Sequence, residues 1–155
     1  MASSNPVQKP IDIFIAYAKA DEQLKNDLAL HLKNLERQRK IRVWHDEKIQ
    51  AGDNWEQEIH QNLAAAHIVL LLISHNFLAS DFYDSHEMKL ILERQEEGSV
   101  HVIPIVLSPV DWDGSYFKNL KALPKGATPI SEWKNKNQAF LTVVKSIREV
   151  VDSLS

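Results

Sequence analysis

Four apolar runs along the chain have the length and composition of buried β-strands. They cover residues 11–15, 41–44, 67–73 and 100–107, and the third is nearly continuous in Leu, Ile and Val. A run without polar alternation is typical of a strand covered on both faces of a parallel sheet. Residues 128–130 predict a fifth, very short strand. Pro104 lies inside the fourth run and favours an edge position or a bulge, because proline has no N–H to donate.

Between these runs, apolar residues recur at helical spacing. Asp21 precedes four leucines spaced by three or four residues and is the predicted N-cap of their helix; these are Leu24, Leu28, Leu32 and Leu35. The same spacing predicts helices over residues 55–63, 83–97 and 137–154, with Gly98 as the C-terminal cap of the middle one. The segments 45–54, 74–81 and 108–125 lack such periodicity and are predicted loops.

The alternation of strands and helices predicts an α/β, flavodoxin-like, three-layer fold. We expect a five-stranded parallel sheet in the order 2-1-3-4-5 with helices on both faces. Residues 1–10 are expected to form a flexible leader and residues 11–155 the domain. In such a sheet the functional crevice lies at the carboxyl ends of strands one and three. Chemistry is therefore expected in segments 16–21, 45–55 and 74–87.

Composition narrows the possible functions. The 155 residues include no cysteine, which excludes disulfides, thiol catalysis and cysteine metal sites. The net charge of -3 argues against direct nucleic-acid binding. The longest apolar stretch, residues 63–73, is too short to cross a membrane, and the polar start does not resemble a signal peptide. We therefore expect a cytoplasmic protein with no membrane or nucleic-acid partner.

Several familiar α/β sites are missing. The four glycines are not placed for a phosphate-binding loop or a dinucleotide fingerprint, and no Gly-x-Ser-x-Gly elbow occurs. A phospho-receiver domain needs an aspartate after strand three, where this chain has Ser74 and His75. The seven histidines form no cluster on one helix face, so no metal site is expected.

Glu87 is the carboxylate that stands out. It lies early in the helix predicted over residues 83–97, with Tyr83 one turn earlier on the same face. An aromatic ring beside a carboxylate can stack on a ligand and stabilise a developing cation. Spacing alone favours the simpler interpretation, that Glu87 interacts with the helix dipole. Trp44 and Trp55 are likewise expected to brace the core rather than to form a ligand cage.

These segments together resemble the Toll/interleukin-1 receptor (TIR) domain family, most of all its bacterial members. Residues 12–17 (DIFIAY) resemble the first conserved box, and residues 43–46 with Gly52 and Asp53 resemble the second strand and the BB loop after it. Residues 80–88 resemble the segment carrying the glutamate of NAD-cleaving members, and residues 102–105 resemble the fourth strand. The similarity covers residues 11–154. Ala16 stands where the family usually has Ser, and Tyr83 where it often has Trp.

The resemblance implies an NAD⁺ glycohydrolase or ADP-ribosyl cyclase that releases nicotinamide and linear or cyclic ADP-ribose, with NAD⁺ as substrate and no cofactor. It implies Glu87 as the catalytic carboxylate. The implied substrate-binding residues are Tyr17, Ala18, Asp21, Trp44, Asp46 and Tyr83. Gly52 and Asp53 would contact another protomer.

The implied partners are copies of the chain, in filaments among other assemblies, and a sensor domain or protein, as in antiphage defence. The alternative is a non-catalytic TIR–TIR signalling or adaptor module. A virulence factor that mimics host TIR domains is a third class.

Overall fold

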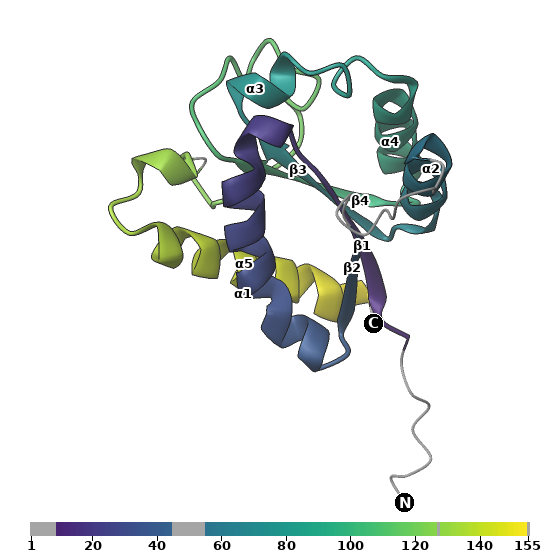
Figure 1. Ribbon diagram of the computed structural model, residues 1–155, viewed down its shortest axis with the longest axis horizontal. Helices are drawn as coiled ribbons and strands as arrows, with labels where there is room; N and C mark the ends of the chain where they lie inside the picture. Colours follow the sequence, from purple (N-terminus) through teal and green to yellow (C-terminus); the bar gives the residue numbers. More distant parts are fainter. Residues whose placement is uncertain (1–8, 45–54, 127, 155) are drawn as a thin grey trace, which may run out of the picture.

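A parallel sheet of four strands lies at the centre of the computed structural model, which describes residues 9–44, 55–126 and 128–154 (Figure 1). The strands are β1 (Ile11–Ala16), β2 (Ile41–Trp44), β3 (Ile68–Ile73) and β4 (His101–Val106). Their order is β2-β1-β3-β4, and every pairing is parallel. The α/β class, the first four strands and their order are therefore as predicted from the sequence.

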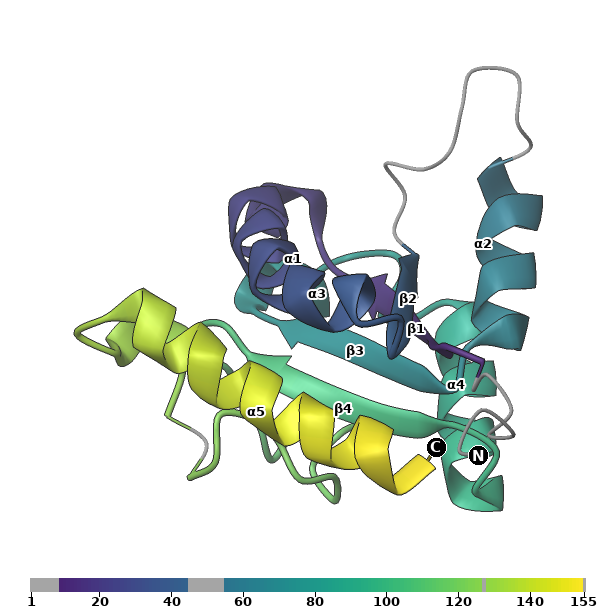
Figure 2. The same ribbon diagram turned by 90° about the horizontal axis from the view of Figure 1, so that it is seen from below.

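Helices cover both faces of the sheet (Figure 2). The helices α1 (Glu22–Arg37) and α5 (Lys136–Leu154) pack on one face, while α2 (Trp55–Ala65) and α4 (His86–Glu97) pack on the other. Three short helices complete the described elements: η2 (Lys19–Asp21), α3 (His75–Leu78) and η4 (Ile130–Glu132). In the described ranges, no helix is both long and apolar enough to span a bilayer.

The continuous apolar run of β3 reflects burial on both faces of the sheet. All six of its side chains are fully buried. Successive side chains of a strand point to opposite faces, so Ile68, Leu70 and Leu72 join the core under α1 and α5. Val69, Leu71 and Ile73 join the second core, under α2 and α4. A polar residue at any of these positions would lie in one of two apolar layers.

The helix predicted over residues 83–97 begins later than expected. Ser85 is its N-cap, with Oγ accepting a hydrogen bond from the Met88 amide at 3.1 Å, and α4 starts at His86. Tyr83 therefore lies outside α4, and the prediction that it belongs to this helix was wrong. Gly98 ends the helix with φ of 78°, as predicted, because only glycine adopts this left-handed conformation at no steric cost. The segment predicted as a loop over residues 74–81 contains α3.

The predicted fifth strand is absent from the described residues. Residues 128–130 lead instead into η4, and Pro129 supplies no N–H for a ladder. The position beside β4 is occupied by Leu123, which forms an isolated parallel bridge with Ile105. Its amide donates to the Pro104 carbonyl, and its carbonyl accepts from the Val106 amide, both at 2.8 Å. On its outer side, Pro104 is therefore bonded to a single residue and not to a further strand. This agrees with the edge position predicted for it.

The side chain of Gln95 also lies at the outer side of β4. Its Oε1 accepts a hydrogen bond from the Val102 amide at 2.7 Å. Nearby, Arg94 joins α4 to the end of α2, because its guanidinium donates to the carbonyls of Leu63 and Ala66 at 2.8 and 3.1 Å. These contacts fix α4 against both of its neighbours.

Candidate functional site at the carboxyl edge of the sheet

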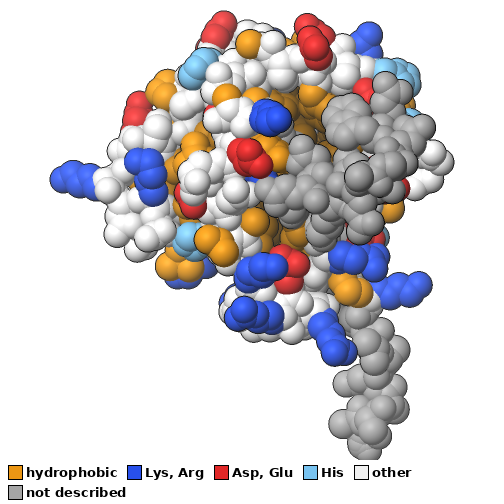
Figure 3. All heavy atoms as spheres, viewed as in Figure 1, with side chains coloured by type: hydrophobic (Ala, Val, Ile, Leu, Met, Phe, Trp, Pro, Cys, Tyr) orange, Lys and Arg blue, Asp and Glu red, His pale blue; other side chains and the backbone are white. Residues whose placement is uncertain are grey.

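The carboxyl ends of all four strands lie at one edge of the sheet, because every pairing is parallel. The helix α4 runs back from this edge to the start of β4, so its first turn is placed there as well. Figure 3 shows hydrophobic side chains open to the surface between α3 and α4. The three segments expected to carry chemistry therefore converge at this edge, as far as they are described.

A small cavity of about 120 Å³ lies between the ends of β1 and β2 and the helix α2. Tyr17 and Trp44, two of the predicted substrate-binding residues, line it together with Phe14, Ile59 and Phe82. The Trp44 ring stacks on Phe14, with 4.9 Å between ring centroids and 17° between planes. The cavity thus presents aromatic surfaces from two strands and from the segment before α4.

The side chain of Lys25 packs against the ring of Tyr17. Its side chain is fully buried on α1, and its Nζ lies 5.0 Å from the centre of the Tyr17 ring. A cation held over an aromatic face is attracted by the ring quadrupole, more strongly when the pair is shielded from water. This contact fixes the ring at the mouth of the cavity.

Asp21 has a different local role from the one expected. It occupies the N-cap position of α1, as predicted, but its carboxylate makes no capping hydrogen bond. Its oxygens instead accept from the Ser74 hydroxyl at 2.5 Å and from the Asn76 amide at 3.2 Å. Ser74 Oγ also accepts from the Phe77 amide and so caps α3. Asp21 therefore ties the turn after β1 to the turn after β3 at the carboxyl edge of the sheet.

Glu87 lies in the first turn of α4 and is half-buried. It precedes Arg94 by seven residues, which is almost two full turns, so both side chains leave the helix on the same flank. Since Arg94 contacts the end of α2, this flank faces α2. Within the described part of the chain, no hydrogen bond or ion pair engages the Glu87 carboxylate. Glu87 is not among the residues that line the small cavity beside Tyr17 and Trp44.

Tyr83 lies on a different side of α4 from Glu87. Its ring stacks on Tyr116 at 4.4 Å, and its hydroxyl accepts a hydrogen bond from the Tyr116 amide at 3.0 Å. Phe77 and Phe117 pack against it in edge-to-face arrangements. Tyr83 lines a second cavity of about 280 Å³ with Met88 and Leu92. The prediction that Tyr83 and Glu87 share one helix face was therefore wrong, because Tyr83 precedes the helix.

Asp84 makes the contact that completes the Tyr83–Tyr116 stack. Its carboxylate accepts a hydrogen bond from the Tyr116 hydroxyl at 2.8 Å. This bond, together with the negative charge of Asp84, raises the pKa of Tyr116 above its usual value. One face of Tyr83 is covered by this arrangement.

The remaining predicted residues are placed as follows. Ala18 is buried just after β1, while Asp46, Gly52 and Asp53 lie outside the described residues. In the ranges described, no three histidine, aspartate or glutamate side chains come together as metal ligands would.

Phe82 and Ile59 line the small cavity, and sequence reasoning did not single them out. Ser85 was the available signal in the sequence. Had it been recognised as the N-cap of α4, Phe82 and Tyr83 would have been predicted to lie in the turn before this helix.

Known proteins resemble this chain in sequence and in fold. The model of the TIR domain family matches residues 13–140. The uncharacterised protein y4lF of Sinorhizobium fredii is 39% identical over 137 residues, which are 88% of this chain and 42% of that protein. The chain thus spans about two fifths of the length of this curated relative.

Two solved structures share the fold. The TIR domain of the Toll-related receptor TRR-2 from Hydra magnipapillata has a TM-score of 0.55 and 19% identity, covering 89% of this chain and 96% of that one. The TIR domains of the activated Roq1 resistosome, which directly recognises the pathogen effector XopQ, have a TM-score of 0.62 and 14% identity, covering 88% and 99%. At these identities the likeness concerns the fold.

Proposed function

Because this chain belongs to the TIR domain family, we propose that it cleaves NAD⁺ to nicotinamide and linear or cyclic ADP-ribose when copies of it assemble. The observation that carries the proposal is the position of Glu87. Its carboxylate is half-buried at the carboxyl edge, on the flank of α4 that faces α2, with no partner among the described residues. A carboxylate placed in this way serves a reaction that develops positive charge.

NAD⁺ cleavage makes modest demands on the protein. Nicotinamide leaves as a neutral base with the electron pair of the glycosidic bond, so no general acid is needed. The ribose then carries oxocarbenium character, which a fixed carboxylate stabilises. Water adds to this carbon and loses a proton to give ADP-ribose, whereas attack by a nitrogen of the adenine gives the cyclic product. We assign the stabilising role to Glu87 and substrate contacts to Tyr17 and Trp44.

The size of the cavity supports a site completed on assembly. Pockets that enclose small ligands have volumes of roughly 300–1,000 Å³, whereas the cavity beside Tyr17 and Trp44 has about 120 Å³. The described residues of one copy therefore do not enclose a dinucleotide. We assign the missing part to residues 45–54, including Asp46, and to another copy of the chain. The similar TIR domains in an activated resistosome support such an assembly.

The direct test is nicotinamide release by clustered protein. The full chain would be fused to an inducible oligomerisation domain, and NAD⁺ consumption and both products would be measured by chromatography before and after induction. We expect turnover to rise steeply with clustering. Clustered protein that consumes no NAD⁺ would contradict the proposal.

Asp53→Arg tests the composite site. We expect this charge reversal in the BB loop to lower assembly and turnover together, because the loop would contact the neighbouring copy. Assembly would be measured by light scattering and turnover by nicotinamide release. Glu97→Arg, at the other end of α4 from Glu87, is the control for charge reversal. If Asp53→Arg abolishes assembly while turnover per molecule is unchanged, the composite site is wrong.

A sensor is the remaining part of the proposal. The chain spans 42% of the curated bacterial relative, so a TIR segment occurs there within a longer protein. We propose that this chain likewise acts in the cytoplasm with a sensor domain or protein that drives its assembly, in antiphage defence.

The alternative function is a non-catalytic TIR–TIR adaptor module. The observation that favours it is the ring of Tyr83, one face of which is covered by Tyr116 rather than open to a substrate. An adaptor would assemble through the same surfaces without consuming NAD⁺. The clustering assay separates the two functions.

A further inference from the structure

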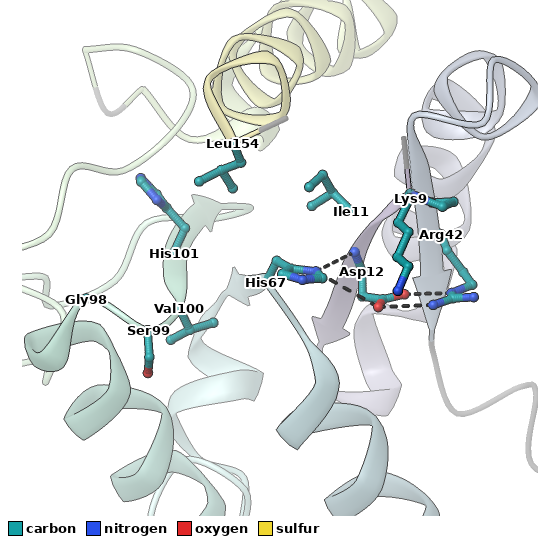
Figure 4. Close-up of a pocket in the computed structure, with 11 residues that line it drawn as sticks. Lys9, Ile11, Asp12, Arg42, His67, Gly98, Ser99, Val100, His101 and Leu154 are labelled. Carbon is teal, nitrogen blue, oxygen red and sulfur yellow. Dashed lines mark hydrogen bonds and ion pairs between the residues drawn. The ribbon is translucent and has the colours of Figure 1, made fainter. Parts of the chain in front are cut away.

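A larger cavity, of about 430 Å³, lies at the opposite edge of the sheet (Figure 4). It is lined by residues from the start of β1, from β2, from the turn before β3 and from the ends of α4 and α5. A six-residue strand is roughly 20 Å long, so this cavity is separated from the carboxyl edge by the full length of the sheet. It has no part in the function proposed above.

The charged side chains gather at one side of this cavity. Figure 4 shows Lys9, Asp12 and Arg42 together there. Arg42 donates from Nε and Nη2 to the two carboxylate oxygens of Asp12, at 2.6 and 3.1 Å. Asp12 thereby fixes the guanidinium and raises the pKa of Arg42 above its ordinary value. With two cations and one carboxylate, the side carries a net positive charge.

Arg42 retains donors for a ligand. A guanidinium has five N–H groups, and the two bonds to Asp12 use one on Nε and one on Nη2. The remaining three are positioned by the same fork, because Asp12 restricts rotation of the guanidinium. A positioned planar donor group of this kind suits phosphate and carboxylate.

His67 adds a further donor between the charged and the apolar sides. Its Nδ1 accepts a hydrogen bond from the Asp12 amide at 2.9 Å. The neutral ring therefore carries its proton on Nε2. His67 lines the cavity, and its side chain is 52% exposed. His101 lines the cavity on the other side, as Figure 4 shows.

Apart from Ser99 and His101, the rest of the wall is apolar or backbone. Ile11, Val100 and Leu154 face the cavity away from the charged side. The volume lies within the range of roughly 300–1,000 Å³ typical of ligand pockets. We propose that this cavity binds a small phosphate monoester with an apolar or aromatic body, the phosphate at Lys9 and Arg42 and the body against Val100 and Leu154.

The test uses phenyl phosphate as the probe, with phenol and inorganic phosphate as its two halves. Binding to the full-length chain would be measured by calorimetry and by the NMR signals of His67 and His101. We expect phenyl phosphate to bind at least about tenfold more tightly than either half, a difference of about 1.4 kcal/mol. Both histidine signals should shift with the same saturation curve.

Two matched substitutions on α5 separate this site from general effects. Leu154 lines the cavity and Leu141 does not, although their exposures are 43% and 41%. We expect Leu154→Glu to weaken phenyl phosphate binding at least about tenfold, because a carboxylate there replaces the apolar contact with the phenyl ring and also repels the anion. Leu141→Glu should bind as the parent does. Equal effects of the two substitutions, equal binding of inorganic phosphate, or shifts that leave His67 and His101 unmoved would overturn the proposal.

Discussion

Replacing Glu87 with glutamine should lower the rate of NAD⁺ cleavage by clustered protein about 10²–10³-fold, equivalent to about 3–4 kcal/mol of transition-state stabilisation. Glutamine retains the size and the hydrogen-bonding capacity of the side chain but removes its charge. The substitution therefore tests electrostatic stabilisation of the cationic ribose rather than packing. Since Glu87 is half-buried and has no partner among the described residues, the fold should not depend on its charge.

The comparison for Glu87→Gln is Glu93→Gln. Glu93 is an exposed residue of the same helix, so the two variants lose the same charge from α4 at different positions. Nicotinamide release, assembly and thermal unfolding would be measured for both. We expect only Glu87→Gln to lose activity while both assemble normally. An assembled Glu87→Gln protein with the parent rate would refute the assignment.

Replacing Phe77 with alanine should lower the free energy of unfolding by about 3–5 kcal/mol, the usual cost of deleting a buried phenylalanine ring. Phe77 is fully buried in α3. Its ring lies 6.1–6.4 Å from the rings of Phe82, Tyr83 and Phe117, centroid to centroid. The cavity left by the substitution would face three rings whose positions depend on the ring of Phe77. Because whole domains have only about 5–15 kcal/mol of stability, this loss would be large.

Phe82→Ala is the paired variant for Phe77→Ala. Phe82 belongs to the same aromatic group but is only partly buried and lines the cavity beside Trp44. We expect Phe82→Ala to lower the free energy of unfolding less than Phe77→Ala does. It should lower the activity per folded molecule more. Urea unfolding with an unchanged m-value gives the stability difference, and nicotinamide release gives the activity. If Phe82→Ala is the more destabilising of the two, the roles assigned to these rings are reversed.

The sheet could be predicted from the sequence because burial on both faces leaves a continuous apolar signal. Ile68–Ile73 is the plainest case, since each of its side chains belongs to one of two cores. The fifth strand could not be predicted correctly, because the residue that pairs with β4 is Leu123. A single bridge produces no periodic pattern in the sequence. The path of the loop before Leu123 determines which residue pairs with β4.

The position of the candidate site residues could be predicted from the sequence, but their contacts could not. Topology alone places Tyr17, Trp44 and Glu87 at one edge, where parallel strands end. The flank on which Glu87 lies depends on where α4 begins, and the hydroxyl of Ser85 decides that. The sequence predicted that the carboxylate of Asp21 caps α1. In the structure it accepts hydrogen bonds from Ser74 and Asn76 instead. Local preference is a weak guide where distant segments supply better partners.

The outer side of β4 has a consequence for the self-assembly that we propose. An open strand edge recruits identical edges into extended aggregates, because its amides lack partners. On β4 the amide of Val102 is bonded to Gln95, Pro104 has no amide hydrogen, and the amide of Val106 is bonded to Leu123. An incoming strand therefore finds no donor at the outward-facing positions 102, 104 and 106. The β4 edge is therefore a poor template for cross-strand polymerisation, and the assembly that we propose would use other surfaces.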